Sequence, residues 1–456
     1  MRIVKIFMVL TLIVAPLLND VSLLNFVLLT VSTIFSILII DNFNLTSNLG
    51  KYLVLFWVWI SVIMMPIYHL VQHIVEDFVN YRVSQVDYNR ILEFGTLIFF
   101  VVVFSIILLG RTRPRKKVNN IEYQPRLINK KYIYIAFIVF FALTAFSHVT
   151  GIAKMGAEPV YLPFHLGGII NLSRRKVAPI LFILLMENYY LNEKKIPSRY
   201  FIIYFVWVII EAFVCMSKGA VVNLTLPLFI VYFLYKRPTF KQSISITIPV
   251  IMIFLFLYPI IGIMRHGDGD FMESFSSAKS AASAESGSVI NLLELKTILN
   301  RAFMTGFQYS VDYKYIDHDQ IFDFSRVPIL LAYGGSQRFQ THVIDGYPIN
   351  AINSSGTTGL IDPLLHGGVG FCVIVVLLII LFANFADNAS EKKQYSIYAQ
   401  LLIMLWGFCN SNISKFYDSI GMQSLLVSIL CIFISYRLNF RIKKRIIVKN
   451  INIQKK

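Results

Sequence analysis

Apolar residues dominate this chain in long uninterrupted blocks. Several blocks run for about 18–22 residues, and a helix of that length spans the roughly 30 Å hydrocarbon core of a bilayer. The alternation of polar and apolar positions that is typical of membrane β-barrel strands does not occur. We therefore expect an all-α fold, a polytopic transmembrane helical bundle. The expected helices lie near residues 3–18, 21–40, 52–71, 91–110, 132–149, 177–191, 200–217, 219–235, 243–264, 357–383, 395–409 and 419–436.

The connections between these blocks differ in charge. One alternate set holds most of the 42 Lys and Arg but few of the 25 acidic residues, and its clearest members are the basic runs at 111–117 and 441–445. Because basic loops stay in the cytoplasm, this set predicts the inner side. About twelve spans with both termini in the cytoplasm agree with every strongly basic connection. The first block resembles a secretion signal, but its removal would invert that agreement, so we expect it to be retained.

Composition supports a membrane protein. The chain has 456 residues, of which 56% are hydrophobic and 15% charged, and its mean hydropathy is +0.66. A soluble protein of this length needs more polar residues to cover its surface. The net charge of +17 gathers in the inner loops, so it indicates topology and attraction to anionic membrane lipid; no basic soluble domain exists to bind nucleic acid. The four cysteines lie in apolar blocks without disulfide or metal-ligand spacing.

Two outer segments interrupt the pattern of short connections. The first covers residues 151–176 and ends in Arg174-Arg175-Lys176. The second, residues 265–356, is expected to be a large periplasmic loop with an amphipathic helix near 289–311 that lies on the outer leaflet or on the bundle. A loop of this length without its own domain indicates a functional role. The resulting division is residues 1–264 for nine helices, 265–356 for the loop, 357–436 for three helices and 437–456 for a basic cytoplasmic tail.

Basic residues on the outer side oppose the topology rule, which makes them candidates for function. Together they can bind a diphosphate at headgroup depth, where Arg binds through two N–H groups and Lys acts as a point charge. The structural alternative is pairing with outer acidic residues or with anionic lipid. For Lys218, the nearest acidic residue is Glu211, two turns earlier on the same predicted helix. The candidates for diphosphate binding are Lys218, Arg265, Arg174, Arg175 and Arg338.

Candidates for a general base lie on the same side, because all eight histidines fall in outer loops or near outer helix ends. The candidates are His266 and Asp268 after the ninth helix, and Asp362 and His366 one turn apart in the tenth. Each carboxylate fits a turn or helix-start role equally well. The chain has no phosphate-binding loop, no hydrolase signature and no metal-ligand cluster, so we expect neither a cofactor nor a metal.

Three stretches resemble bacterial O-antigen polymerases, the Wzy-type oligosaccharide repeat-unit polymerases. They are Ser217-Lys-Gly-Ala220, Ile263-Met-Arg265 and residues 353–370. The likeness in architecture covers nearly the whole chain, whereas the likeness in motif covers few residues. The related O-antigen ligases carry a His near the start of the third stretch, where this chain has Ser354 and Ser355. That difference disfavours a ligase and leaves the base unassigned.

The resemblance implies a metal- and nucleotide-independent glycosyltransferase of the GT-C type in the bacterial inner membrane. Its substrates would be undecaprenyl-diphosphate-linked oligosaccharides at the periplasmic face. The growing chain would move en bloc onto the non-reducing end of a new repeat unit, and a polysaccharide chain-length regulator would be its partner. Outer cations would hold the departing diphosphate, and an outer carboxylate or imidazole would take the acceptor proton.

Other functions stay open from sequence alone. A flippase for lipid-linked oligosaccharides needs ionisable groups along the membrane interior and pairs two related halves. A ligase or membrane O-acyltransferase needs a catalytic His, and an envelope-assembly partner needs no catalytic group. The nearly charge-free mid-span segments, the absence of a half-repeat and the long outer loop favour the polymerase.

Overall fold

The computed structural model describes most of the predicted helices. Regular structure in the described residues is helical, apart from two short strands, and this confirms the all-α class. The amphipathic helix predicted at 289–311 lies outside the described residues, as do Lys218, Arg265, His266, Asp268 and Arg338. The described residues are 2–18, 21–43, 47–63, 85–111, 123–124, 128–152, 162–163, 166–215, 224–225, 229–235, 242, 261, 320–332, 339, 360–391, 394–409, 419–439 and 441–442.

The element bounds follow the apolar blocks closely. The first half contains α1 (Arg2–Leu18), α2 (Leu23–Asn42), α3 (Leu49–Val58) with the π-helical turn η2 (Trp59–Ile63), α5 (Gln85–Arg111) and α6 (Lys131–Thr150). Then come α7 (Leu166–Leu172), the π-helical turn η5 (Ser173–Val177), α8 (Ala178–Glu193) and α9 (Ser198–Cys215). The second half contains α15 (Val327–Ala332), α17 (Ile361–Glu391), α18 (Tyr395–Cys409) and α19 (Ser419–Asn439), while β1 (Tyr123–Gln124) pairs antiparallel with β2 (Arg441–Ile442).

Five helices of the described part are long and apolar enough to cross a membrane. They are α2, residues Asn89–Gly110 of α5, α6, α9 and α17. Shorter apolar helical stretches occur in α1, α3, α18 and α19. The chain is therefore a helical membrane protein, and the count of about twelve spans stays a prediction.

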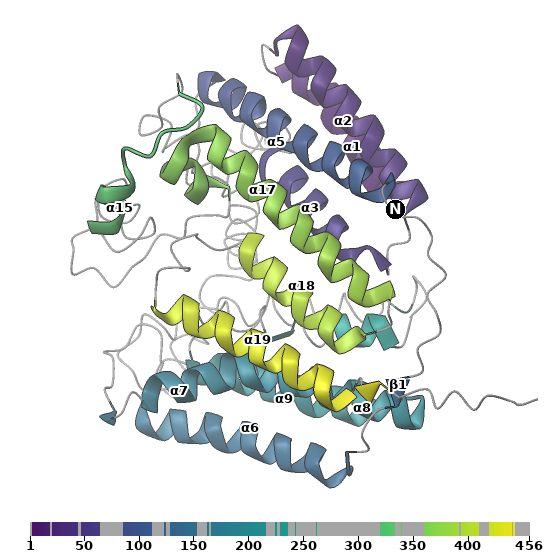
Figure 1. Ribbon diagram of the computed structural model, residues 1–456, viewed down its shortest axis with the longest axis vertical. Helices are drawn as coiled ribbons and strands as arrows, with labels where there is room; N and C mark the ends of the chain where they lie inside the picture. Colours follow the sequence, from purple (N-terminus) through teal and green to yellow (C-terminus); the bar gives the residue numbers. More distant parts are fainter. Residues whose placement is uncertain are drawn as a thin grey trace, which may run out of the picture.

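The helices lie in a stack along the long axis of the molecule (Figure 1). At one end α1 packs on α2 and α2 packs on α5, which packs on α3 and α17. In the middle α18 packs on both α17 and α19, and at the other end α19 packs on α8 and η5, with α6 against α9. Thus α17 and α18 join the two ends of the stack.

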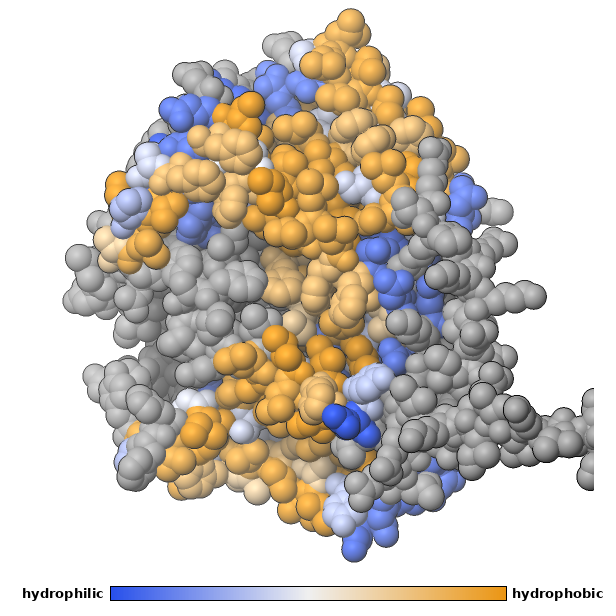
Figure 2. Space-filling view, viewed as in Figure 1, coloured by the Kyte–Doolittle hydropathy of each residue, from blue (hydrophilic) through white to orange (hydrophobic). Residues whose placement is uncertain are grey.

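The surface of the stack is apolar over a broad zone. Figure 2 shows apolar residues down the middle of the visible face, with polar residues toward its left and right margins. Single side chains on this surface are large and exposed, such as Ile138 at 66% and Leu378 at 57%. Lipid tails are as apolar as these side chains, so the exposure carries no penalty in a bilayer.

Asp387, near the end of α17, caps the start of α3. Its carboxylate accepts hydrogen bonds from the backbone N–H of Gly50 at 2.9 Å and of Lys51 at 3.3 Å, and the Tyr398 hydroxyl donates to it at 3.1 Å. The Lys51 ammonium lies 3.4 Å away, and both charged side chains are buried. First-turn N–H groups have no partner within their own helix, so a carboxylate there satisfies them and meets the positive end of the helix dipole.

A second buried carboxylate does the same for α18. Glu187 of α8 accepts the backbone N–H of Ser396 at 2.8 Å. Its neighbour Asn188 accepts the backbone N–H of Ile128 at 3.2 Å, just before α6. The end of α8 therefore fixes where two other helices begin.

The helix predicted to start at residue 177 begins instead at Leu166. Helices α7, η5 and α8 follow one another without a gap, so the segment expected as a connection at 151–176 is helical from Leu166 onward. Pro179 lacks the N–H that an α-helix would use, and the wider π-helical turn before it accommodates that loss. Arg174 and Arg175 consequently lie on a helix that packs into the bundle.

We expect Asp387→Ala to lower the free energy of unfolding by about 3–5 kcal/mol, because the buried Lys51 ammonium loses its counter-ion and α3 loses its cap. Thermal unfolding of the detergent-solubilised chain measures this change. Asp41→Ala is the matched control, since the Lys5–Asp41 pair is partly exposed, and we expect it to cost about 0–1 kcal/mol. Equal losses in the two variants would contradict the capping role.

Candidate functional site

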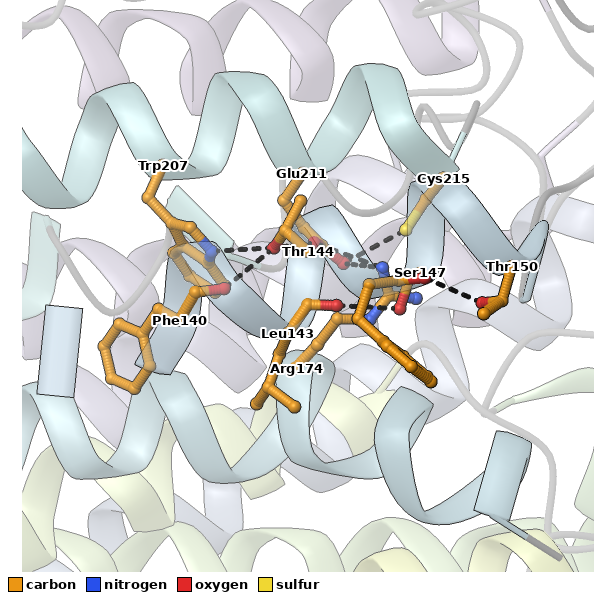
Figure 3. A network of polar contacts seen from close by, with 10 residues as sticks. Phe140, Leu143, Thr144, Ser147, Thr150, Arg174, Trp207, Glu211 and Cys215 are labelled. Atoms are coloured by element: carbon orange, nitrogen blue, oxygen red, sulfur yellow. Dashed lines mark hydrogen bonds and ion pairs between the residues drawn. The ribbon is translucent and has the colours of Figure 1, made fainter. Parts of the chain in front are cut away.

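A buried ion pair joins η5 to α9 (Figure 3). Nη1 of Arg174 lies 3.2 Å from Oε1 and 3.3 Å from Oε2 of Glu211, and neither side chain is exposed to any extent. The Thr144 hydroxyl, on α6, donates to Oε2 at 2.7 Å, and the Cys215 thiol donates to Oε1 at 3.0 Å. Three helical elements therefore meet at one carboxylate.

The polar network continues one step further into the bundle. The indole N–H of Trp207 donates to the Thr144 hydroxyl oxygen at 3.0 Å (Figure 3). That hydroxyl then donates its own proton to Glu211, which is a charged acceptor and is nearer than the Phe140 carbonyl at 3.0 Å. Both oxygens of Glu211 are thus saturated with donors, as a buried carboxylate requires.

Arg174 uses only one of its three nitrogens for Glu211. Its Nε and Nη2, on the opposite edge of the guanidinium plane, are buried and have no hydrogen-bond partner among the described residues. Two parallel N–H groups on one edge match two oxygens of a phosphate or carboxylate. Because a buried donor without a partner costs about 1–3 kcal/mol, this edge is a candidate binding position for an oxyanion.

Arg175, the residue after Arg174, adds a further positive charge to the η5 turn. Arg175 also has a buried Nε without a partner in the described part of the chain. The η5 turn has the sequence Ser-Arg-Arg-Lys-Val and no acidic residue of its own. The turn therefore carries more positive charge than Glu211 alone neutralises.

Asp362 and His366 lie one turn apart at the start of α17, and both are buried. Nδ1 of His366 is 2.7 Å from the Asp362 carbonyl oxygen and 3.4 Å from its carboxylate Oδ1. A neutral imidazole in this position donates from Nδ1, so its lone pair is on Nε2; we assign this tautomer from the contact. Such an imidazole has the form that accepts a proton in catalysis.

The helix breaks directly after this pair. Gly367 and Gly368 have non-helical dihedral angles, and Gly368 has a φ of 73°, in the left-handed region that favours glycine. Asp362 and His366 thus belong to a short turn that is separate from the long part of α17. Within a membrane, non-helical backbone occurs where it contacts protein or lines a cavity.

The structure brings Arg174 together with Arg175, and Asp362 together with His366, but it does not join the two pairs. The η5 turn packs against α6, α8 and α19, whereas α17 packs against α3, α5 and α18. Figure 1 shows the start of α17 and helix α7 toward the same side of the view, separated along the long axis. In the described part of the chain, no group of three or more His, Cys, Asp or Glu is placed to hold a metal ion.

Sequence reasoning missed the partner of Arg174. It associated Glu211 with Lys218, on the same predicted helix, and it assigned Cys215 no disulfide or metal-ligand role and no hydrogen bond. Cys215 is buried as expected, but it also donates to Glu211. The available signal was Glu211 itself, because an acidic residue inside an apolar block needs a partner.

A double-mutant cycle measures the coupling within this site. We expect Glu211→Ala to destabilise the folded chain by about 3–5 kcal/mol, since it leaves a buried guanidinium without its counter-ion. Adding Arg174→Met to Glu211→Ala is expected to restore part of that loss, because the buried charge is then removed. Thermal unfolding in detergent gives the losses in stability of Glu211→Ala, Arg174→Met and the double variant. Strictly additive losses would contradict the direct pairing.

Comparison of the chain with protein-family models, curated proteins and solved structures gives no match. A proposal about function therefore depends on the geometry described above and on the three stretches that resemble the O-antigen polymerases.

Proposed function

We propose that this chain is a membrane glycosyltransferase of the GT-C type that polymerises oligosaccharide repeat units carried on undecaprenyl diphosphate. The observation that carries the proposal is the unpaired edge of Arg174. A buried guanidinium that is held by one nitrogen, with Nε and Nη2 lacking a hydrogen-bond partner among the described residues, suits an oxyanion that arrives from the membrane. A diphosphate on a lipid carrier is such an oxyanion.

The chemistry of the proposed reaction needs this kind of group. When a glycosyl–diphosphate bond breaks, negative charge grows on the departing diphosphate oxygen. Bidentate hydrogen bonds from a fixed guanidinium stabilise that charge in a site that excludes water. The energy for the transfer is already present in the lipid-linked substrate, so no nucleotide is required.

The ion pairs support a periplasmic location for Arg174. In each ion pair between described helices, both partners lie at helix ends that the charge rule assigns to the same side of the membrane. Figure 1 places the N-terminus on the opposite side of the view from α7 and the start of α17. The pairs assigned to the cytoplasmic side are Lys5–Asp41, Lys51–Asp387 and Lys130–Glu193, and the pair assigned to the periplasmic side is Arg174–Glu211.

Asp362 and His366 suit the second requirement, a proton acceptor for the attacking hydroxyl. His366 has the tautomer of a general base, and Asp362 holds its Nδ1 side. The attacking hydroxyl and the departing diphosphate meet at one anomeric carbon, and the described residues do not join Arg174 to the Asp362–His366 pair, so His366 is one candidate base beside others. His266 and Asp268 stay predictions as bases, and Lys218, Arg265 and Arg338 stay predictions as diphosphate ligands.

The same observations weigh against a flippase. A flippase needs ionisable groups along the membrane interior. The described buried carboxylates Glu187, Glu211, Asp362 and Asp387 lie toward helix ends instead, and each has a polar partner where it lies.

Replacing Arg174 tests the proposal. Arg174→Lys keeps the charge but loses the two-pronged edge, and Arg174→Ala loses both, so we expect both to reduce long-chain surface polysaccharide about 100-fold or more. Capped single repeat units should persist. Gel electrophoresis of the polysaccharide, from cells with matched amounts of each variant, measures chain length.

The matched control is Arg199→Ala, an exposed arginine at the opposite end of α9, which should leave chain length unchanged. Wild-type chain lengths from a stably expressed Arg174→Ala variant would remove Arg174 from the site. Loss of single repeat units as well would favour the flippase.

His366 has its own test. We expect His366→Ala to slow the joining of lipid-linked repeat units in isolated membranes by about 100-fold, the low end of the range for general base catalysis. His148→Ala is the control, because His148 is exposed at the end of α6 that is expected to face the same side. Equal rates for the two variants would exclude His366 and leave His266 and Asp268 as candidates.

A further inference from the structure

Residues 320–332 present an apolar surface beside the broken start of α17. Ile321 is 70% exposed, Phe322 49% and Phe324 52%. Ile329 and Leu331 of α15 are also about half exposed. Adjacent apolar side chains with this much exposure indicate a contact surface for something other than water.

The backbone of this segment is fixed to α17. The carbonyl oxygen of Ile321 accepts the Gly370 N–H at 2.7 Å, and the N–H of Asp323 donates to the Gly367 carbonyl oxygen at 3.2 Å. The Phe324 ring also packs edge-on against Phe371, with ring centroids 5.6 Å apart. The exposed side chains therefore have a defined position on the outside of the helix.

Close approach at Gly370 makes this docking possible. A Cβ atom at Gly370 would lie 2.7 Å from Phe322 and 2.8 Å from the Ile321 carbonyl oxygen. Any larger residue would push the 320–332 segment away from the helix.

The docked segment contacts α17 at the N-terminal end of an exposed apolar face of that helix. Residues four, seven and eleven positions after Gly370 share its helical face. These residues are Ile374, Leu377 and Leu381, which are 42%, 37% and 51% exposed. Ile321 and Phe322 cover Gly370 and so extend this apolar stripe beyond the break in the helix.

Polar groups of the same segment suit the headgroup region. The side chain and backbone N–H of Ser325 hydrogen-bond to Asp323 and lower the pKa of that carboxyl, which keeps it ionised. Nη1 of Arg326 is buried and has no hydrogen-bond partner among the described residues. A phospholipid phosphate is a suitable acceptor for it.

We propose that residues 320–332 dip into the bilayer at this end of the bundle, with Ile321, Phe322 and Phe324 among the acyl chains and Arg326 at the phosphate level. The occupant of the apolar surface is thus membrane lipid. Continuity with the exposed stripe of α17 carries this assignment, and it does not depend on the proposed glycosyltransferase activity. Aromatic and cationic side chains commonly share this depth in membranes.

Depth-dependent fluorescence tests the proposal on the full chain in lipid nanodiscs. Phe322→Cys and Ser325→Cys variants are labelled with an environment-sensitive nitrobenzoxadiazole dye, and the unmodified chain measures labelling of the four native cysteines. We expect the label at 322 to be quenched several-fold more by bromines on lipid acyl chains than by iodide in the buffer. The label at 325 should show the reverse order.

A second substitution makes the result independent of the label itself. Gly370→Val in the Phe322→Cys chain should displace the segment and remove most of the quenching by lipid bromines. Gly407→Val is the matched control, because a Cβ at Gly407 in α18 meets nothing within 4 Å, and it should leave the quenching unchanged. Strong iodide quenching at 322 would overturn the proposal, and so would protection from both quenchers, which would indicate that protein covers the segment.

Discussion

The rule that a buried carboxylate needs a partner, either a helix end or a cation, governs how the described helices of this structure pack. Three buried carboxylates meet that rule in different ways. Asp387 and Glu187 each satisfy the first turn of another helix, and Glu211 satisfies a buried guanidinium. Breaking a buried pair costs more than forming it returns, so these carboxylates determine which helices can be neighbours. The order α3–α17–α18–α8 along the stack follows from Asp387 and Glu187.

The Glu211 pair also resolves a conflict in the proposed site. A buried arginine without any counter-ion would cost several kcal/mol, which is a large fraction of the stability of an ordinary protein. A bidentate pair through Nε and Nη2 would occupy the edge that is left for a substrate. Pairing through Nη1 alone neutralises Arg174 and keeps Nε and Nη2 for a phosphate. Thr144 and Cys215 make this geometry stable, because their donors occupy the positions on Glu211 that a second arginine nitrogen would otherwise take.

Much of the fold was predictable because a bilayer demands apolar blocks of a certain length. The helix predicted at 395–409 has the observed bounds Tyr395–Cys409, since hydropathy ends where the helix ends. The prediction failed at residues 166–177, where Arg174 and its neighbours end the apolar run although the helix continues. The charged turn stays helical inside the bundle because Arg174 pairs with Glu211, which belongs to a different helix. The sequence of one helix indicates how deep each of its residues lies in the membrane. Which residues of different helices lie side by side depends on how the helices pack.

The contact between Gly50 and Asp387 has a consequence for how the protein is made. The two residues are 337 positions apart, so α3 leaves the ribosome long before its cap has been synthesised. Until α17 is inserted, the Lys51 ammonium has no Asp387 counter-ion, and the N–H groups of Gly50 and Lys51 need water or lipid headgroups as partners. The first part of the chain therefore completes its packing only near the end of translation, and a chain that stops before Asp387 leaves α3 without this cap.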